Sequence, residues 1–305
     1  MTKRKYAGTW TALITPFKKD GSIDEDSLRK LARRQIESGV AGIVPVGTTG
    51  ESPTTTMEED ARIFEIVGEE IRKAKSEGFE IMMMAGTGSN CTRDAVKYTE
   101  NAKKHGADCC LVVTPYYNKP TPKGLKLHFD AVSDVGLPVI VYNIKGRCGI
   151  NIDTDTLMEI AKHPKVVGVK EASGDLDQMK EVISRRGEAA VGDGFTVLSG
   201  DDGMTLDLIR AGGDGVISVA SNIVPDKISE MVEYALAGNF EEAGKINEQF
   251  ARMFTELFVE ANPIPVKYAA SRMGLCELIY RLPMCEPTEK GAEVVDAMLK
   301  DYNLI

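Results

Sequence analysis

Short apolar runs alternate with amphipathic segments along most of the chain. The apolar runs are rich in Val and Ile and are typical of parallel strands that are covered on both faces. They predict strands at residues 9–15, 42–46, 80–85, 108–113, 138–142, 166–171, 196–199 and 215–219. The segments between them, apolar on one side only, predict helices at 24–38, 57–75, 92–105, 123–135, 153–162, 175–185, 204–211 and 226–237.

This order of strand–helix units predicts a (β/α)8 TIM barrel, an α/β fold. A doubly wound sheet is the alternative, but it more usually stops at about five or six strands. After Gly238 the pattern is helical only, at 240–258, 264–273 and 288–300. We therefore expect a catalytic barrel at residues 1–238 and a C-terminal helical appendix at 239–305, packed on the barrel or on a neighbouring subunit.

Several helix ends carry sequence signals. Thr92 and Asp153 are N-cap candidates, because their side-chain oxygens can accept from free N–H groups of a first turn. Gly39 and Gly106 follow helical patterns and fit the positions where a chain leaves a helix in a left-handed conformation.

Composition excludes several classes of protein. The 305 residues are 43% hydrophobic and 27% charged, and no run approaches the roughly 18 apolar residues that span a bilayer. The basic N-terminus, MTKRKYAGTW, has no apolar segment after it, so we expect no secretory signal and a cytoplasmic location. A net charge of −9 disfavours nucleic acid as a partner, because phosphate contacts need a basic surface.

Neither a metal nor a cofactor is expected. The three histidines, His105, His128 and His163, are scattered without a ligand pattern. The six cysteines form no CxxC pair and are expected to be reduced thiols. Cys109 and Cys110 stand in an apolar run, so small core fillers are their expected role.

The active site of such a barrel forms at the C-terminal ends of its strands. Those ends carry GTTGES (47–52), AGTGSN (85–90), TPYYN (114–118), YNIKGR (142–147), VKEAS (169–173), SGDD (199–202) and the region of Ile217. The loops after the last two strands contain no Lys or Arg, which disfavours a phosphorylated substrate.

Lys170 is the most informative residue among them, because it closes the apolar run VVGVK. Apolar surroundings disfavour the charged form of a lysine, which lowers its pKa and frees the amine to attack a carbonyl carbon. The alternative is an ordinary ion pair with Glu171 or with another carboxylate at the barrel mouth.

Neighbouring strand ends offer matching chemistry. The Tyr142 hydroxyl can shuttle a proton, although an aromatic core plug is the commoner fate of a strand tyrosine. Thr48 and Thr49 stand between glycines and can bind a carboxylate through hydroxyl and N–H donors, unless the loop is a plain turn. Arg147 can bind a second carboxylate with two parallel hydrogen bonds, or form a surface ion pair.

Taken in order, these motifs resemble the dihydrodipicolinate synthase/N-acetylneuraminate lyase family of pyruvate-dependent class I aldolases. The resemblance covers nearly the whole chain: GTTGES, AGTGSN, TPYYNKP, the YN…R…G segment, GVKEASG, LSGDD, GVISV and NPIPVK (262–267). Within the family the chain most resembles the lyases that condense pyruvate with L-aspartate 4-semialdehyde on the diaminopimelate route to lysine.

The resemblance implies a role for each matching residue of the catalytic relay. Lys170 would form the imine with pyruvate, and Tyr142 would donate and accept protons in a relay with Thr48 and Tyr117. In the family, the tyrosine that matches Tyr117 enters the active site from a neighbouring subunit. The resemblance therefore implies at least a dimer, and it also implies a homotetramer built as a dimer of dimers.

It implies binding residues as well. Thr49 and the backbone of Ile217 would hold pyruvate, with Gly200 in the same pocket wall. Arg147 would bind the carboxylate of the semialdehyde.

Two positions depart from the commoner family pattern YNxPxRTG, because this chain reads YNIKGRCG. Lys145 replaces a proline, which leaves the backbone before Arg147 less constrained in φ. Cys148 replaces a threonine and removes a strong hydroxyl partner beside the arginine. Both changes bear on the preference for the second substrate and leave the imine chemistry intact.

Feedback by L-lysine is expected to be weak or absent. Lysine-inhibited relatives typically carry histidines in the helix after GTTGES, where this chain has Met57 and Asp60. Asn90, Asp94 and Tyr116 are nevertheless candidates to line such an allosteric site. Inhibition at low micromolar lysine in a steady-state assay would contradict this expectation.

Two other functions remain open from the sequence. One is a different pyruvate aldolase of the family, which cleaves N-acetylneuraminate, 2-keto-3-deoxygluconate or a hydroxy-oxoglutarate. The other is a catalytically silent binding protein, against which the complete set of Lys170, Tyr142 and Thr48 argues.

Overall fold

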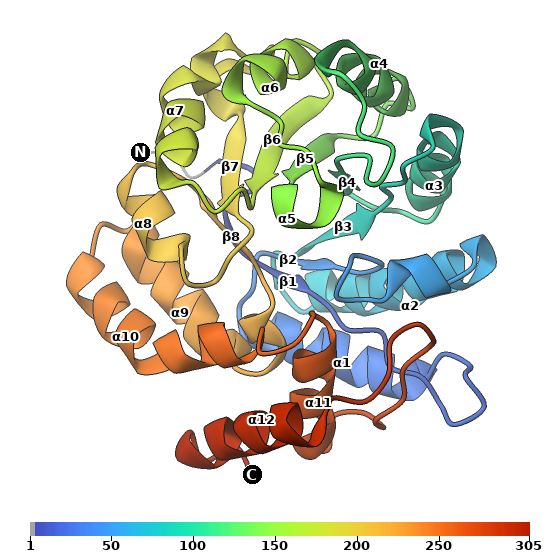
Figure 1. Ribbon diagram of the computed structural model, residues 1–305, viewed down its shortest axis with the longest axis vertical. Coiled ribbons are helices and arrows are strands. Elements are labelled where there is room, and N and C mark those ends of the chain that lie inside the picture. Colours follow the sequence, from blue (N-terminus) through green and yellow to red (C-terminus); the bar gives the residue numbers. More distant parts are fainter. Residues whose placement is uncertain (1–3) are drawn as a thin grey trace.

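A closed barrel of eight parallel strands forms the centre of the molecule (Figure 1), as the sequence predicted. The computed structural model describes residues 4–305. The strands pair in chain order and β8 pairs with β1. They are β1 (Gly8–Ala12), β2 (Gly42–Val44), β3 (Met82–Gly86), β4 (Cys109–Val113), β5 (Val139–Asn143), β6 (Val166–Glu171), β7 (Thr196–Ser199) and β8 (Gly215–Ser218).

Helices surround the barrel and connect successive strands (Figure 1). Those that connect successive strands are α1 (Glu25–Glu37), α2 (Met57–Ser76), α3 (Thr92–Lys104), α4 (Pro122–Ser133), α6 (Thr154–Ile160), α7 (Leu176–Arg185) and α8 (Thr205–Arg210). The helix α9 (Pro225–Leu236) follows the last strand, β8. The sequence pattern missed a further short helix, α5 (Lys145–Cys148), which follows β5 directly.

Alternate side chains of the strands point into the barrel or out toward the helices. Trp10, Leu111, Ile140 and Leu198 belong to a buried cluster inside the barrel. Trp10 is fully buried there and faces Gly42 across the β1–β2 pair. A Cβ atom at Gly42 would lie 2.2 Å from the Trp10 ring, so only glycine leaves room for the indole.

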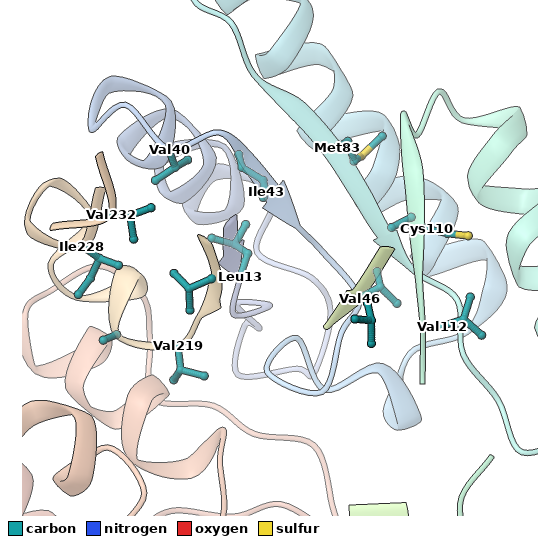
Figure 2. Close-up of a cluster of buried hydrophobic side chains, with 14 of the residues drawn as sticks. Leu13, Val40, Ile43, Val46, Met83, Cys110, Val112, Val219, Ile228 and Val232 are labelled. Atoms are coloured by element: carbon teal, nitrogen blue, oxygen red, sulfur yellow. The ribbon is translucent and has the colours of Figure 1, made fainter. Parts of the chain in front are cut away.

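The outward-pointing side chains form a second and larger core with the helices. Figure 2 shows part of this core, where Ile43 and Met83 from neighbouring strands lie in one buried layer with Ile228 and Val232 of α9. The neighbouring cysteines separate between the two cores: Cys109 belongs to the inner one and Cys110 to the outer one. Both are fully buried, as their expected role as core fillers requires.

The helix caps follow the sequence signals with one correction. The side chain of Asp153 accepts from the Thr156 N–H at the start of α6, and Thr56 forms a capping box with Glu59 at the start of α2. Thr92 does not cap α3, because Cys91 occupies the N-cap position. The Thr92 hydroxyl instead lies 3.0 Å from Nδ1 of the buried His128 on α4.

The end of the barrel opposite the active-site mouth is closed by a buried ion pair. Asp214 immediately precedes β8, and its carboxylate lies 3.1 Å from the guanidinium of Arg186 and 2.7 Å from that of Arg4. The same carboxylate accepts from the Val197 N–H. This cluster ties the N-terminal segment to the base of the barrel.

Three C-terminal helices, α10 (Phe240–Glu256), α11 (Ile264–Arg272) and α12 (Glu289–Asp301), complete the chain. Phe250, Met253, Val266 and Met298 join the same hydrophobic core as the outer face of the barrel. Their division from residues 1–238 as a separate region remains a prediction. None of the helices in residues 4–305 combines the length and apolar character that a membrane crossing requires.

Candidate active site

A cavity of about 410 Å³ opens at the C-terminal ends of the strands and brings together most of the predicted site residues. Its walls include Thr48, Thr49, Tyr116, Tyr142, Arg147, Lys170 and Gly200. Tyr117, Ile217, Asn90 and Asp94 are not among the described residues that line it. Strand ends that lie far apart in sequence therefore converge on one enclosed space, as the barrel geometry requires.

Lys170 lies on β6, where its side chain points into the cavity and only 5% of its surface is exposed. Burial lowers the pKa of Lys170 from 10.5 to about 7, against the opposing influence of Asp202. The next residue, Glu171, points to the other side of the strand and accepts from Asn143, Gln178 and the Ser173 N–H. The sequence alternative of a Lys170–Glu171 ion pair therefore does not apply.

Tyr142 lies beside Lys170 on the neighbouring strand, since the two residues are partners in the β5–β6 register. The Lys170 Nζ atom is 4.3 Å from the centroid of the Tyr142 ring. Burial raises the pKa of Tyr142 above its usual range, so the hydroxyl carries its proton at neutral pH. The Tyr142 carbonyl accepts from both the N–H and the hydroxyl of Thr114, at 2.9 and 2.8 Å, which fixes the end of β5.

Gly200 provides the space in which the lysine side chain lies. A Cβ atom at this position would come within 3.0 Å of the Lys170 Cε atom and within 2.5 Å of the Ala172 Cβ atom. Gly200 also lines the cavity, in agreement with its predicted place in the pocket wall. A larger residue at this position would therefore push against Ala172 and the side chain of Lys170.

Thr48 and Thr49 stand in a tight loop after β2. The residues before and after this loop, Val46 and Glu51, both have left-handed backbones, with φ of 57° and 56°. Thr49 is buried and its Oγ1 atom accepts a 3.0 Å hydrogen bond from the side-chain amide of Asn262. Thr48 is only partly buried and lines the cavity with its neighbour.

Arg147 lies on the short helix α5 and also lines the cavity. Its guanidinium donates a 3.0 Å hydrogen bond to the Asn262 carbonyl. Where the missing proline suggested a less constrained backbone, the chain forms a hydrogen-bonded helical turn that Gly149 ends with φ of 76°. The Cys148 thiol donates to the Thr114 carbonyl at 3.1 Å, and burial raises its pKa to about 11, so it stays protonated.

Tyr117 does not reach the cavity within its own chain. Its side chain is 89% exposed, and its φ of 75° is rare for a residue with a Cβ atom. The preceding Tyr116 does line the cavity. The predicted relay of Tyr142, Thr48 and Tyr117 is thus not complete within one subunit.

Ile217 is fully buried in the inner cluster of the barrel, one residue before the end of β8. Its predicted backbone contact with pyruvate stays a prediction.

Asp60, Thr55 and Tyr98 also line the cavity. The Thr55 hydroxyl donates to Asp60 at 2.6 Å, and burial raises the pKa of Asp60 to about 6. Of the candidates for an L-lysine site, only Tyr116 lines this cavity, while the carbonyl of Asn90 accepts from Asn118 and the carboxylate of Asp94 lies against Arg93. Weak feedback by lysine stays a prediction.

Several site residues were not singled out from the sequence. Asn262 contacts both Thr49 and Arg147, and Phe258 lines the cavity beside it. Asp202 is buried, opposes the lowering of the Lys170 pKa, and accepts from the Val219 and Ala220 N–H groups. Asn262 begins the NPIPVK motif, and this motif was the only sequence signal that could have pointed to it. Asn262 and Thr49 are 213 positions apart in the chain, and only the tertiary structure brings them into contact.

Within residues 4–305 no three His, Cys, Asp or Glu side chains are gathered closely enough to hold a metal ion.

Comparisons with known proteins show what the chain as a whole is similar to. The profile of the "Dihydrodipicolinate synthetase family" matches residues 5–302. A 4-hydroxy-tetrahydrodipicolinate synthase of Citrifermentans bemidjiense is 44% identical over 98% of this chain and 100% of its own, and one of Endomicrobium trichonymphae is 46% identical over 98% and 99%. A crystal structure of dihydrodipicolinate synthase from Acinetobacter baumannii, complexed with pyruvate, has a TM-score of 0.92 at 40% identity and covers 98% of this chain and 100% of its own.

Proposed function

The chain belongs to the dihydrodipicolinate synthetase family, and from this premise we propose that it is a lyase that condenses pyruvate with L-aspartate 4-semialdehyde. The product is 4-hydroxy-tetrahydrodipicolinate, on the diaminopimelate route to lysine. We further propose that the reaction runs through an imine on Lys170. No metal or cofactor takes part in the steps proposed here.

One observation carries the proposal of an imine. The Lys170 amine is buried at the wall of the cavity, its pKa is lowered to about 7, and no carboxylate in residues 4–305 forms an ion pair with it. A substantial fraction of this amine is therefore neutral at physiological pH, with its lone pair free to attack a carbonyl carbon.

The first half of the reaction forms the imine. The neutral amine of Lys170 attacks the ketone carbon of pyruvate, and the resulting carbinolamine loses its hydroxyl as water after protonation. The buried Tyr142 supports this step, because its ring lies beside the lysine and its raised pKa keeps a proton on the hydroxyl. Thr48 and Tyr117 would then pass a proton from solvent back to the Tyr142 hydroxyl. Such acid–base steps contribute about 10²–10⁴-fold in rate.

The second half forms the carbon–carbon bond. The protonated imine withdraws electrons from the pyruvate methyl group, which loses a proton to give an enamine. The enamine carbon attacks the aldehyde, whose oxygen takes up a proton. The amino group of the condensed product then displaces the Lys170 nitrogen by transimination as the ring closes, and the free lysine is regenerated.

The two carboxylates would be bound by different residues of the cavity. Thr49, with the backbone of Ile217, would hold the carboxylate of pyruvate, and Gly200 would close the pocket behind the lysine. Arg147 would hold the carboxylate of the semialdehyde, since its side chain faces the same cavity and one nitrogen is already steadied by Asn262.

Trapping with borohydride tests the imine directly. Pyruvate plus borohydride should add one reduced pyruvate unit to the mass of the protein, on the peptide that contains Lys170. The Lys170→Ala variant should gain no mass and lose essentially all turnover. Equal turnover in that variant, or an unmodified wild-type protein, would rule out the proposed chemistry and favour a silent binding protein.

A second candidate function is another pyruvate aldolase of the same family. The sequence departures at Lys145 and Cys148, both on the helix that carries Arg147, are the observation that favours it. We propose that kcat/KM for L-aspartate 4-semialdehyde exceeds the values for N-acetylmannosamine, glyceraldehyde and glyoxylate, each supplied with pyruvate. A higher value for any of these other aldehydes would overturn the assignment of the second substrate.

Assembly follows from the proposed relay. Because Tyr117 is exposed in its own chain, its hydroxyl would have to enter the cavity of a neighbouring subunit. At least a dimer is therefore proposed, with a homotetramer, as a dimer of dimers, as a further prediction of the family resemblance. A cytoplasmic location is proposed because the basic N-terminus has no apolar segment after it.

A further inference from the structure

The loop that carries Thr48 and Thr49 is held in an unfavourable backbone conformation. Val46 and Glu51, which border the loop, have positive φ angles of 57° and 56°. Side chains with a Cβ atom rarely adopt this region, and Val46 is also branched at Cβ. Such a conformation persists only when the surrounding structure imposes it. The contacts of the loop with its surroundings therefore decide the geometry of both threonines.

Glu51 supplies the strongest of these contacts. Its carboxylate is 2% exposed and lies 2.5 Å from the Nζ atom of Lys267. The second carboxylate oxygen accepts a 3.1 Å hydrogen bond from the Arg281 N–H. Both oxygens are thus bound by residues that lie more than 200 positions later in the chain.

Lys267 is specialised for this contact. It lies on α11 and is fully buried, with 0% of its side chain exposed. Its Nζ atom lies 4.3 Å from the centroid of the Phe17 ring and 5.2 Å from that of Tyr280. Two aromatic faces and one carboxylate therefore surround the ammonium group, and no solvent contact competes with Glu51.

Two further contacts from the same C-terminal region reach the loop on either side of Glu51. The Asn262 amide donates to Thr49 at 3.0 Å, and the guanidinium of Arg281 donates to the Thr54 carbonyl at 2.8 Å. Residues 262–281 thus contact the loop at three successive places. A core built only for stability would not need a buried charge pair between Glu51 and Lys267. Apolar residues can often replace such a pair without a loss of stability.

We propose that Lys267 and Glu51 are positioning residues, through which the C-terminal helices hold Thr48 and Thr49 in the geometry that binds pyruvate. This inference rests on the proposed function, since it concerns the same cavity and the same substrate. It makes the C-terminal region part of the active site, although Lys267 itself lies outside the cavity and touches no substrate.

Three variants test the proposal: Lys267→Met, Glu51→Gln, and the combination of both. Methionine matches the length of the lysine stem, and the combined variant leaves no unpaired buried charge, so it is the one expected to fold best. The matched control is Arg186→Met, which breaks the buried pair with Asp214 at the opposite end of the barrel. Thermal unfolding of each protein sets a common assay temperature well below every Tm.

The decisive measurement is the pyruvate concentration that gives half-maximal imine trapping, with no aldehyde present. The Lys267→Met and combined variants should raise it by about 10- to 10²-fold, because a small misplacement of binding groups has effects of that size. KM for pyruvate should rise in parallel, and more than KM for the aldehyde. Arg186→Met should lose thermal stability while its half-saturation stays at the wild-type value.

Unchanged half-saturation in the combined variant would overturn the proposal, whatever happens to Tm. So would an equal rise in Arg186→Met, which would show that any loss of stability loosens the site. A wild-type protein that traps no pyruvate would instead defeat the proposed function itself, and the two failures are thereby distinguishable. If Lys267→Met does not fold, the combined variant and Glu51→Gln still decide the question.

Discussion

Lys170 and Glu171 are adjacent on β6, but their side chains point to opposite sides of the strand. The strand alternation sends the lysine into the cavity and the glutamate to the outer side, where Asn143 and Gln178 bind it. The amine is thus separated from the carboxylate next to it in sequence, and burial is free to lower its pKa.

The lowered pKa of Lys170 predicts a pH dependence of imine formation. Only the neutral amine attacks a carbonyl, and its fraction rises as pH increases through the pKa of about 7. The rate of borohydride-trapped imine formation at low pyruvate should therefore increase from pH 6 and level off above about pH 8. A rate that is flat over this range, or that rises only near the ordinary lysine pKa of 10.5, would contradict the lowered value.

At the scale of secondary-structure elements, the barrel depends on a few glycines whose backbone packs directly against a large side chain. Gly42 of β2 faces the indole of Trp10 on β1, and Gly200 after β7 faces the side chain of Lys170. Strand β2 also ends earlier than the apolar pattern predicted, at Val44 instead of residue 46, because Val46 turns into the left-handed region to begin the threonine loop.

The contact between β1 and β2 predicts the effect of Gly42→Ala. The added methyl carbon would lie 2.2 Å from the Trp10 ring, so the indole or the strand must shift inside a packed barrel. We expect a loss of about 1–3 kcal/mol in the free energy of unfolding, measured by denaturant titration. Gly244→Ala on α10 is the control, because its Cβ atom would meet nothing within 4 Å and should stabilise the helix. Equal stability of the two variants would contradict this prediction, because it would show that the barrel interior accommodates the added methyl group without a loss of stability.

At the scale of the whole molecule, the candidate site extends beyond one barrel. Its cavity is lined by strand ends from across the barrel and by Phe258 and Asn262 of the C-terminal region. One member of the predicted relay, Tyr117, lies on the surface of its own chain.

Complementation between two inactive variants tests whether Tyr117 acts across a subunit interface. Lys170→Ala lacks the amine, and Tyr117→Phe should lose much of its turnover because the relay is interrupted. In a mixed dimer, the site that retains Lys170 would receive an intact Tyr117 from the other chain. The mixture should therefore exceed the summed activity of its two parents after subunit exchange. Activity equal to that sum, with exchange verified by mass, would place Tyr117 outside the partner's site.

The sequence by itself determined the barrel, the ends of the strands as the place of the candidate site, and most of the residues predicted to act there. These features follow from local periodicity and from short motifs, and the positions of Lys170, Tyr142, Thr49 and Gly200 follow from where each strand stops. The pattern could not show that residues 145–148 form a helical turn, since that turn is short and has no apolar period.

Only the tertiary structure decided which distant residues complete the site. The contact of Asn262 with Thr49 and the pair of Lys267 with Glu51 join residues 213 and 216 positions apart. No local preference encodes such pairs, because they arise from how whole helices pack on the barrel. The lowered pKa of Lys170 belongs to the same class, since burial is a property of the folded chain and not of the residue.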